Sequence, residues 1–171
     1  MYLQVLLVVN GIQINGTESG IHILPDGTTI SAENRFIKNT QNRSAGNANP
    51  ALTAVQAVQA AASQLNYTVR GTFSVLERNK GASQETLISD GGISLSNIPA
   101  KLMYQLNENG ELVLTWDISI EETSRQNWWS LRVDASTGNI IDTANWMVSC
   151  SFEHDHSMHE NVLDYNANLY D

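Results

Sequence analysis

Residues 128–141, WWSLRVDASTGNII, have the pattern of a β-hairpin. Apolar and polar residues alternate on both sides of a tight DASTG turn, as in two strands that each bury one face. Within the turn, the Asp134 carboxylate can accept hydrogen bonds from the backbone N–H groups that follow it. Gly138 can supply a positive φ where the chain re-enters the sheet. The stretch therefore predicts antiparallel strands joined by a turn with a defined signature.

The neighbouring segments extend this prediction to a whole sheet with a covering helix. The stretch 111–120 alternates strictly, with one apolar face formed by Leu112, Leu114, Trp116, Ile118 and Ile120. An Asn-Gly turn at 107–110 connects it to an earlier strand, 101–106. Helical spacing occurs at about 50–65, where Pro50 would lie in the first turn and Asn49 would cap it. These elements predict an α+β fold of antiparallel sheets with one covering helix.

The remaining segments suggest four consecutive parts of the chain. Residues 1–38 read as a β-meander, with one strand over 2–9, a turn at Asn10-Gly11 and further strands at 21–24 and 29–37. Residues 39–49 hold no large apolar side chain and suggest a linker or a long loop. Residues 50–148 would form the α+β domain, which also includes a strand expected at 69–77. Residues 149–171 would be an acidic tail that contains histidines.

Composition excludes some classes of function. The net charge of −9 comes from 9 basic and 18 acidic residues, and such a surface repels nucleic acid. No apolar run reaches the length of a membrane-spanning helix. A single cysteine allows no internal disulfide. The apolar start of the chain is interpreted as a strand, so a signal peptide of an exported protein would lie upstream.

Few residues suggest chemistry. His154, His156 and His159, with Cys150 nearby, could bind a transition metal, but a solvated acidic segment is the favoured interpretation. No catalytic residue and no cofactor is predicted, and the zinc-peptidase motif H-E-x-x-H does not occur.

Trp128 and Trp129 are adjacent in a predicted strand, so their side chains should point to opposite faces. They cannot both lie in the core of one layer. Because exposed aromatic residues often anchor protein contacts, whichever of the two faces outward is a candidate partner contact.

Two segments of the chain carry residues that match known motifs. The first set is Tyr2, Gln4, Asn10, Gly11, Ile12, Ile14, Asp26 and Gly27, and the second is Leu114, Trp116, Ile118, Val133, Asp134, Ala135, Thr137, Gly138 and Ile140. The first set resembles the fungalysin/thermolysin propeptide hairpins, and the second is similar to the PepSY-like half of the same pro-regions, which belong to fungalysin-type secreted zinc metallopeptidases. The resemblance covers about residues 2–148.

This resemblance implies cystatin-like or PepSY-like sheets and a non-enzymatic role as intramolecular chaperone and inhibitor. The implied partner is the catalytic domain of the same secreted precursor, and the zinc would belong to that domain. An alternative is a free-standing exported module that inhibits proteases or binds at a cell surface. Self-association through open sheet edges is a further possibility.

Overall fold

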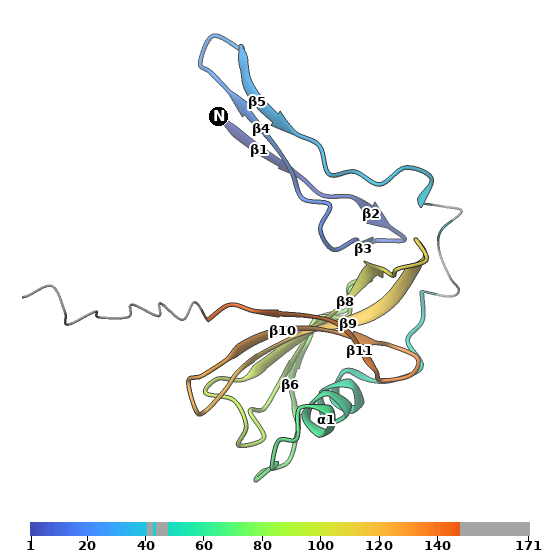
Figure 1. Cartoon of the computed structure of the whole chain (residues 1–171), viewed down its shortest axis with the longest axis vertical. Coiled ribbons are helices and arrows are strands. Elements are labelled where there is room, and N and C mark those ends of the chain that lie inside the picture. The colour runs from blue at the N-terminus through green and yellow to red at the C-terminus, as the bar shows by residue number, and fades with distance from the viewer. Residues whose placement is uncertain (41–42, 44–47, 148–171) are drawn as a thin grey trace, which may run out of the picture.

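Strands dominate the structure, a computed structural model that describes residues 1–40, 43 and 48–147 (Figure 1). In this part of the chain the elements are β1 (Tyr2–Val5), β2 (Val8–Val9), β3 (Ile12–Gln13), β4 (Ser19–Ile23), β5 (Thr29–Glu33), α1 (Ala54–Gln64), β6 (Val75–Arg78), β7 (Thr86–Ile88), β8 (Ile98–Leu106), β9 (Leu112–Glu121), β10 (Trp128–Asp134) and β11 (Ile140–Asn145). They form an antiparallel six-stranded sheet β11-β10-β9-β8-β7-β6, a three-stranded sheet β1-β4-β5 and the hairpin β2-β3. The predicted α+β class is confirmed.

The six-stranded sheet is built around β8, β9 and β10. Its register pairs Leu102 with Trp116 and Ile118 with Leu131. The alternation predicted for 111–120 is confirmed, because all five apolar residues of that face are buried. Period-two alternation has therefore placed one continuous apolar face on the sheet.

Helix α1 begins at Ala54, four residues later than predicted. Thr53 is its N-cap: the hydroxyl accepts from the Gln56 backbone N–H, and the Gln56 side chain accepts from the Thr53 N–H. The expectation that Asn49 caps a helix starting at Pro50 is wrong. The N–H groups of Ala51 and Leu52 instead donate to the carbonyl oxygen of Ala135, which holds this stretch against the β10–β11 turn. The T-x-x-Q sequence was the better start signal.

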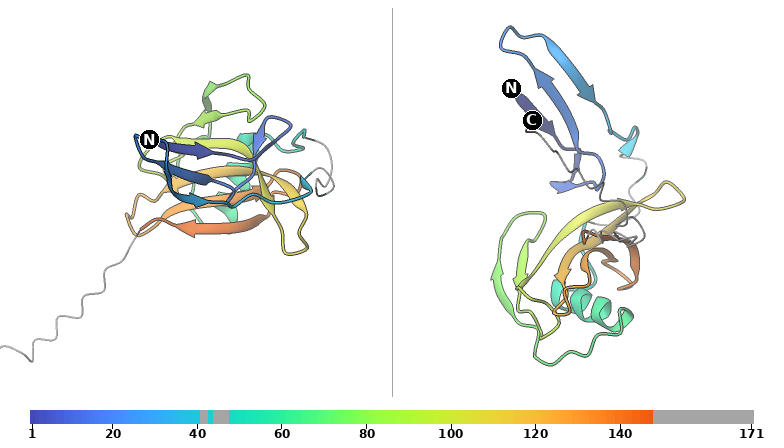
Figure 2. Two further views of the ribbon diagram at one scale, coloured as in Figure 1. Left: turned by 90° about the horizontal axis from the view of Figure 1, so that it is seen from above. Right: turned by 60° about the vertical axis from the view of Figure 1, so that its left-hand side comes forward.

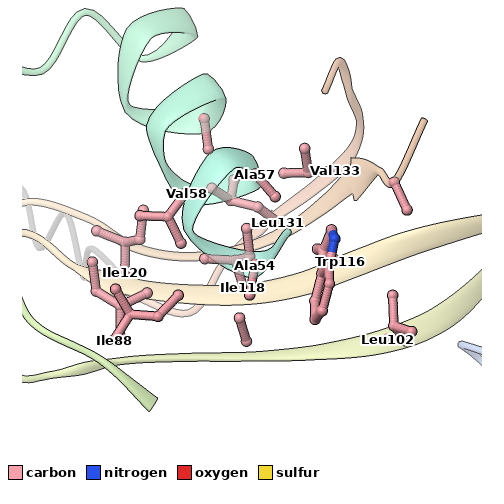
Figure 3. Close-up of a cluster of buried hydrophobic side chains, with 14 of the residues drawn as sticks. Ala54, Ala57, Val58, Ile88, Leu102, Trp116, Ile118, Ile120, Leu131 and Val133 are labelled. Atoms are coloured by element: carbon pink, nitrogen blue, oxygen red, sulfur yellow. The ribbon is translucent and has the colours of Figure 1, made fainter. Parts of the chain in front are cut away.

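Small residues bring α1 close to the sheet. Ala54, Ala57 and Val58 are fully buried and face the apolar side chains of β9 and β10 (Figure 3). The loop before the helix is fixed as well, because Trp116 Nε1 donates to the carbonyl oxygen of Leu52 at 2.9 Å. Because α1 has no charged side chains that could pair along its surface, we expect these tertiary contacts to supply most of its stability.

The N-terminal strands lie on the side of the six-stranded sheet opposite α1 (Figures 1 and 2). The expected meander is wrong in its pairing: the strand predicted at 2–9 is broken after Val5, and β1 pairs with β4 rather than with the strand that follows it. Asn10-Gly11 do form the β2–β3 turn, with φ of 52° and 78°. Ile14 is buried and bridges Tyr104, so β3 anchors this region to β8.

Of the strand expected at 69–77, only the last part forms, as β6 from Val75 to Arg78. The backbone N–H groups of Arg70 and Gly71 both donate to the carbonyl oxygen of Gly91, at 3.1 and 3.0 Å. These bonds hold the chain in a loop, so regular pairing with β7 begins at Val75.

Candidate partner-binding face

The face of the six-stranded sheet opposite α1 is polar at its centre. On β9, the residues between the core positions are Thr115, Asp117 and Ser119, and on β10 the matching residues are Ser130 and Arg132. The register places Arg132 opposite Asp117 and Ser130 opposite Ser119. The alternation that fills the core on one side therefore gathers these groups on the other.

An ion pair occupies the middle of this face. Arg132 Nη1 lies 2.7 Å from Asp117 Oδ1 and 2.9 Å from Ser130 Oγ, and Lys101 Nζ lies 4.0 Å from Asp117 Oδ2. The side chains of Asp117 and Arg132 are only 19% and 11% exposed. Burial raises the pKa of Asp117 above its ordinary value, although the two cations act in the opposite direction. The Asp117–Arg132 ion pair therefore forms the floor of this face, held in place by the hydrogen bond from Arg132 to Ser130.

A cavity of about 800 Å³ lies over this floor. We call it the open-face groove. Its lining comes from β3 and the turn after it, from the β6–β7 hairpin, from the central strands and from the segment after β11; the residues are Gln13, Asn15, Glu18, Glu77, Asn79, Glu85, Thr86, Leu87, Pro99, Ala100, Lys101, Met103, Asp117, Ser119, Trp128, Ser130, Arg132 and Trp146. Its volume is in the range of protein sites that hold ligands.

Two tryptophans form one end of the groove. The rings of Trp128 and Trp146 pack together with centroids 5.4 Å apart and a 60° interplanar angle. Trp128 Nε1 also donates to Ser119 Oγ at 2.9 Å, which fixes its ring over β9. The two residues nevertheless remain 36% and 55% exposed. Trp128 therefore presents an oriented aromatic surface at the groove.

Trp129 points to the other face of β10. It is half-buried against the core cluster, and its Nε1 donates to Glu122 Oε1 at 3.1 Å. Of the two tryptophans, Trp128 is thus the outward-facing one. Partner contact by either remains a prediction.

Glu122 lies directly after β9, in the connection that leads to β10. Its carboxylate accepts hydrogen bonds from Tyr67, Ser124, Asn127 and Trp129. Burial alone would raise the pKa of Glu122, but these hydrogen bonds, led by the one from Tyr67, lower it below its ordinary value. Burial and the same bond raise the pKa of the Tyr67 phenol. The arrangement stabilises a corner of the fold.

The DASTG turn lies at the helix side of the sheet. Asp134 Oδ1 accepts from the backbone N–H groups of Ser136 and Thr137 at 2.7 and 3.0 Å. Gly138 has a φ of 80°, and its carbonyl oxygen accepts from the Gln64 side chain at 2.8 Å. The turn therefore joins the end of the sheet to the end of α1.

The metal-binding candidates Cys150, His154, His156 and His159 lie outside the described residues. Over residues 1–40, 43 and 48–147, no group of three or more His, Cys, Asp or Glu side chains could hold a metal ion. Within the same ranges, no helix is long and apolar enough to cross a membrane.

Sequence reasoning missed most of the groove. Asp117, Arg132 and Trp146 were not singled out, although the first two occupy the polar positions of recognised strands. A charged residue in the middle of a long strand is uncommon, so Asp117 and Arg132 could have been recognised from the sequence as candidate site residues. The predicted hairpin pairs the strands of Trp128 and Trp146, but it does not predict their contact, because a register shift between Arg132 and Val133 changes which residues lie opposite each other.

The chain is similar to two fungal extracellular metalloproteinases. It is 27% identical over 132 residues to extracellular metalloproteinase 1 of Phaeosphaeria nodorum, which covers 77% of this chain and 21% of the relative. It is 24% identical over 147 residues to extracellular metalloproteinase 1 of Arthroderma otae, which covers 85% of this chain and 23% of the relative. No family model matches. The chain thus spans less than a quarter of the curated relatives it matches.

Proposed function

We propose that this chain is a pro-region of a secreted zinc metallopeptidase, which assists folding of the catalytic domain and inhibits it until cleavage. The proposal rests on the difference between the share of this chain and the share of each relative that the similarity covers. The similarity includes 77% and 85% of this chain but only 21% and 23% of the two metalloproteinases. Such coverage fits a unit that accompanies the catalytic part of a larger precursor.

The architecture is compatible with a role performed by binding. One face of the sheet is covered by α1, and its opposite face offers an oriented tryptophan and a groove of about 800 Å³. A preformed surface loses little conformational entropy on association. In this proposal the zinc and the reacting groups belong to the catalytic domain, and the chain supplies complementary shape. The extracellular relatives support export of the precursor.

Inhibition can be tested with purified proteins. The 171-residue chain is titrated into the mature metallopeptidase from the same precursor, and cleavage of a fluorogenic peptide is followed. We expect inhibition at micromolar concentration or below, whereas an unrelated serine peptidase should be unaffected. Absence of both inhibition and binding would contradict the proposal.

The folding role needs its own measurement. The catalytic domain is unfolded in denaturant and diluted into zinc-containing buffer with or without an equimolar amount of the chain. We expect a higher yield of active enzyme, or faster recovery, in its presence. An equal yield and rate with serum albumin in place of the chain would remove the chaperone part of the proposal.

A further inference from the structure

The open-face groove has two chemically different ends. Trp128 and Trp146 lie at β10 and just after β11, whereas Glu77 lies on β6 and Glu85 just before β7. The sheet order β10-β9-β8-β7-β6 separates these ends by four strand spacings. At the usual spacing this is about 19 Å, the length of about six residues of extended chain.

In the part of the chain that the structure describes, no salt bridge neutralises the charge at the far end. The two cations that line the groove, Lys101 and Arg132, are both directed at Asp117. Among the described residues, neither Glu77 nor Glu85 forms a salt bridge, and both are exposed. Glu18, on the β3 side, interacts with the neutral side chain of Gln13. The groove therefore offers acceptors and negative charge to an incoming group.

The aromatic end suits an apolar side chain. With centroids 5.4 Å apart, Trp128 and Trp146 are in contact, so a ligand cannot insert between them and can only pack on their outer surfaces. Exposed fractions of 36% and 55% leave such surfaces available. Aromatic residues held in a fixed orientation are frequent anchors of protein contacts.

We propose that the open-face groove binds an extended peptide segment of about six residues, with basic side chains toward Glu77 and Glu85 and an apolar side chain on Trp128 and Trp146. Charge complementarity selects this occupant over an acidic segment. The inference deepens the proposed function and rests on it only for the origin of the segment, which would belong to the catalytic domain of the peptidase.

The groove is tested first with peptides and the full chain. Fluorescein-labelled hexapeptides carry two lysines at one end and Phe-Leu at the other, in both chain orders, and anisotropy reports binding. At least one order should bind, and replacing its lysines by glutamates should weaken binding about tenfold or more. No binding up to millimolar concentration, or equal binding of the acidic peptides, would overturn the proposal.

Variants locate the binding. Trp128→Ala should weaken binding of the lysine peptide about tenfold, and the double variant Glu77→Gln/Glu85→Gln should weaken it and reduce its dependence on salt. Leu95→Ala removes a comparably exposed side chain, 43% accessible, outside the groove and should change nothing. Circular dichroism verifies folding, and the Gln variants preserve shape if Trp128→Ala is unstable. Equal affinity of all variants would overturn the assignment to the groove.

Two further results separate the possible occupants. If the chain dimerises in light scattering and Trp128→Ala abolishes the dimer, a second copy fills the groove and the peptide assignment is wrong. The bound peptide should also compete with the mature peptidase and relieve its inhibition. Peptide binding without competition would overturn the origin of the segment, while the proposed inhibition would still stand on its own assay.

Discussion

Gly138 shows at the residue scale how a backbone conformation and a packing contact can restrict the same position. Its φ of 80° favours glycine, and a Cβ added there would lie 3.2 Å from both Ala60 Cβ and Leu52 Cδ1. Gly27 has a similar φ of 87°, but a Cβ there would meet nothing within 4 Å. Comparing substitutions at Gly27 and Gly138 therefore separates the cost of the backbone conformation from the cost of the packing contact.

We expect Gly27→Ala to lower the free energy of unfolding by about 1–2 kcal/mol, the cost of the left-handed conformation. Gly138→Ala should lower it by about 1–3 kcal/mol more, because the methyl group crowds α1 and the loop before it. Urea denaturation followed by tryptophan fluorescence measures both. If the two variants lost the same free energy of unfolding, the new methyl group at position 138 would be accommodated by Ala60 and Leu52 at no cost, and the prediction would be wrong.

The Asp117–Arg132 pair gives a prediction that depends on pH. Arg132→Met leaves a buried carboxylate without its main cation and should cost about 3–5 kcal/mol at neutral pH. The pKa of Asp117, already raised by burial, should rise further. A raised carboxyl pKa favours the folded state at low pH and loses this advantage as pH rises, so the deficit should be smallest below about pH 4.

Urea denaturation at several pH values tests this, with Asp117→Asn/Arg132→Met as the matched control. Since the control has no buried charge, it should regain much of the stability at neutral pH and lose the pH dependence. A deficit in Arg132→Met that stays constant from pH 4 to 8 would contradict the account.

At the scale of the element, α1 depends on its cap and its contacts. Thr53→Ala removes the hydroxyl that accepts from the Gln56 N–H and should cost about 1 kcal/mol. Ser63→Ala, at an exposed position near the other end of the helix, should be neutral or slightly stabilising because alanine favours helices. Thermal denaturation followed by circular dichroism compares the two. If Thr53→Ala were as stable as Ser63→Ala, Thr53 would not be the effective cap.

At the scale of the whole molecule, β3 joins the N-terminal strands to the main sheet. Ile14 is fully buried in the same cluster as α1, and the Asn15 N–H donates to the carbonyl oxygen of Tyr104 at 2.8 Å. Asn15 Nδ2 also donates to the Gln105 side chain at 2.8 Å. These contacts therefore join residues about ninety positions apart in the sequence.

We therefore expect Ile14→Ala to destabilise the main sheet and not only the N-terminal strands. The loss should be about 2–5 kcal/mol, as for other buried isoleucines. Val8→Ala, at a 50% exposed position, should have little effect. Hydrogen exchange gives the readout: amides of β8 and β9 should exchange faster in Ile14→Ala. A change confined to residues 1–38 would mean that this region unfolds independently.

Some features follow from the sequence because they are local. Strict alternation at 111–120 determines which side chains share a face, since successive residues of a strand point to opposite sides. The same rule predicts that Trp128 and Trp129 diverge. Asn10-Gly11 predicts its hairpin turn because both residues tolerate positive φ.

Only the tertiary structure decided the features that depend on distant partners. The pairing of β1 with β4 joins segments that local patterns do not bring together. The packing of Trp146 on Trp128 depends on a register shift within the β10–β11 hairpin, which alternation alone does not predict. The groove is of this kind, since its lining comes from β3, the β6–β7 hairpin and the chain after β11. The alternation of residues along a strand determines the face on which each side chain lies. Which side chains it contacts on that face depends on how distant segments pack together in the core.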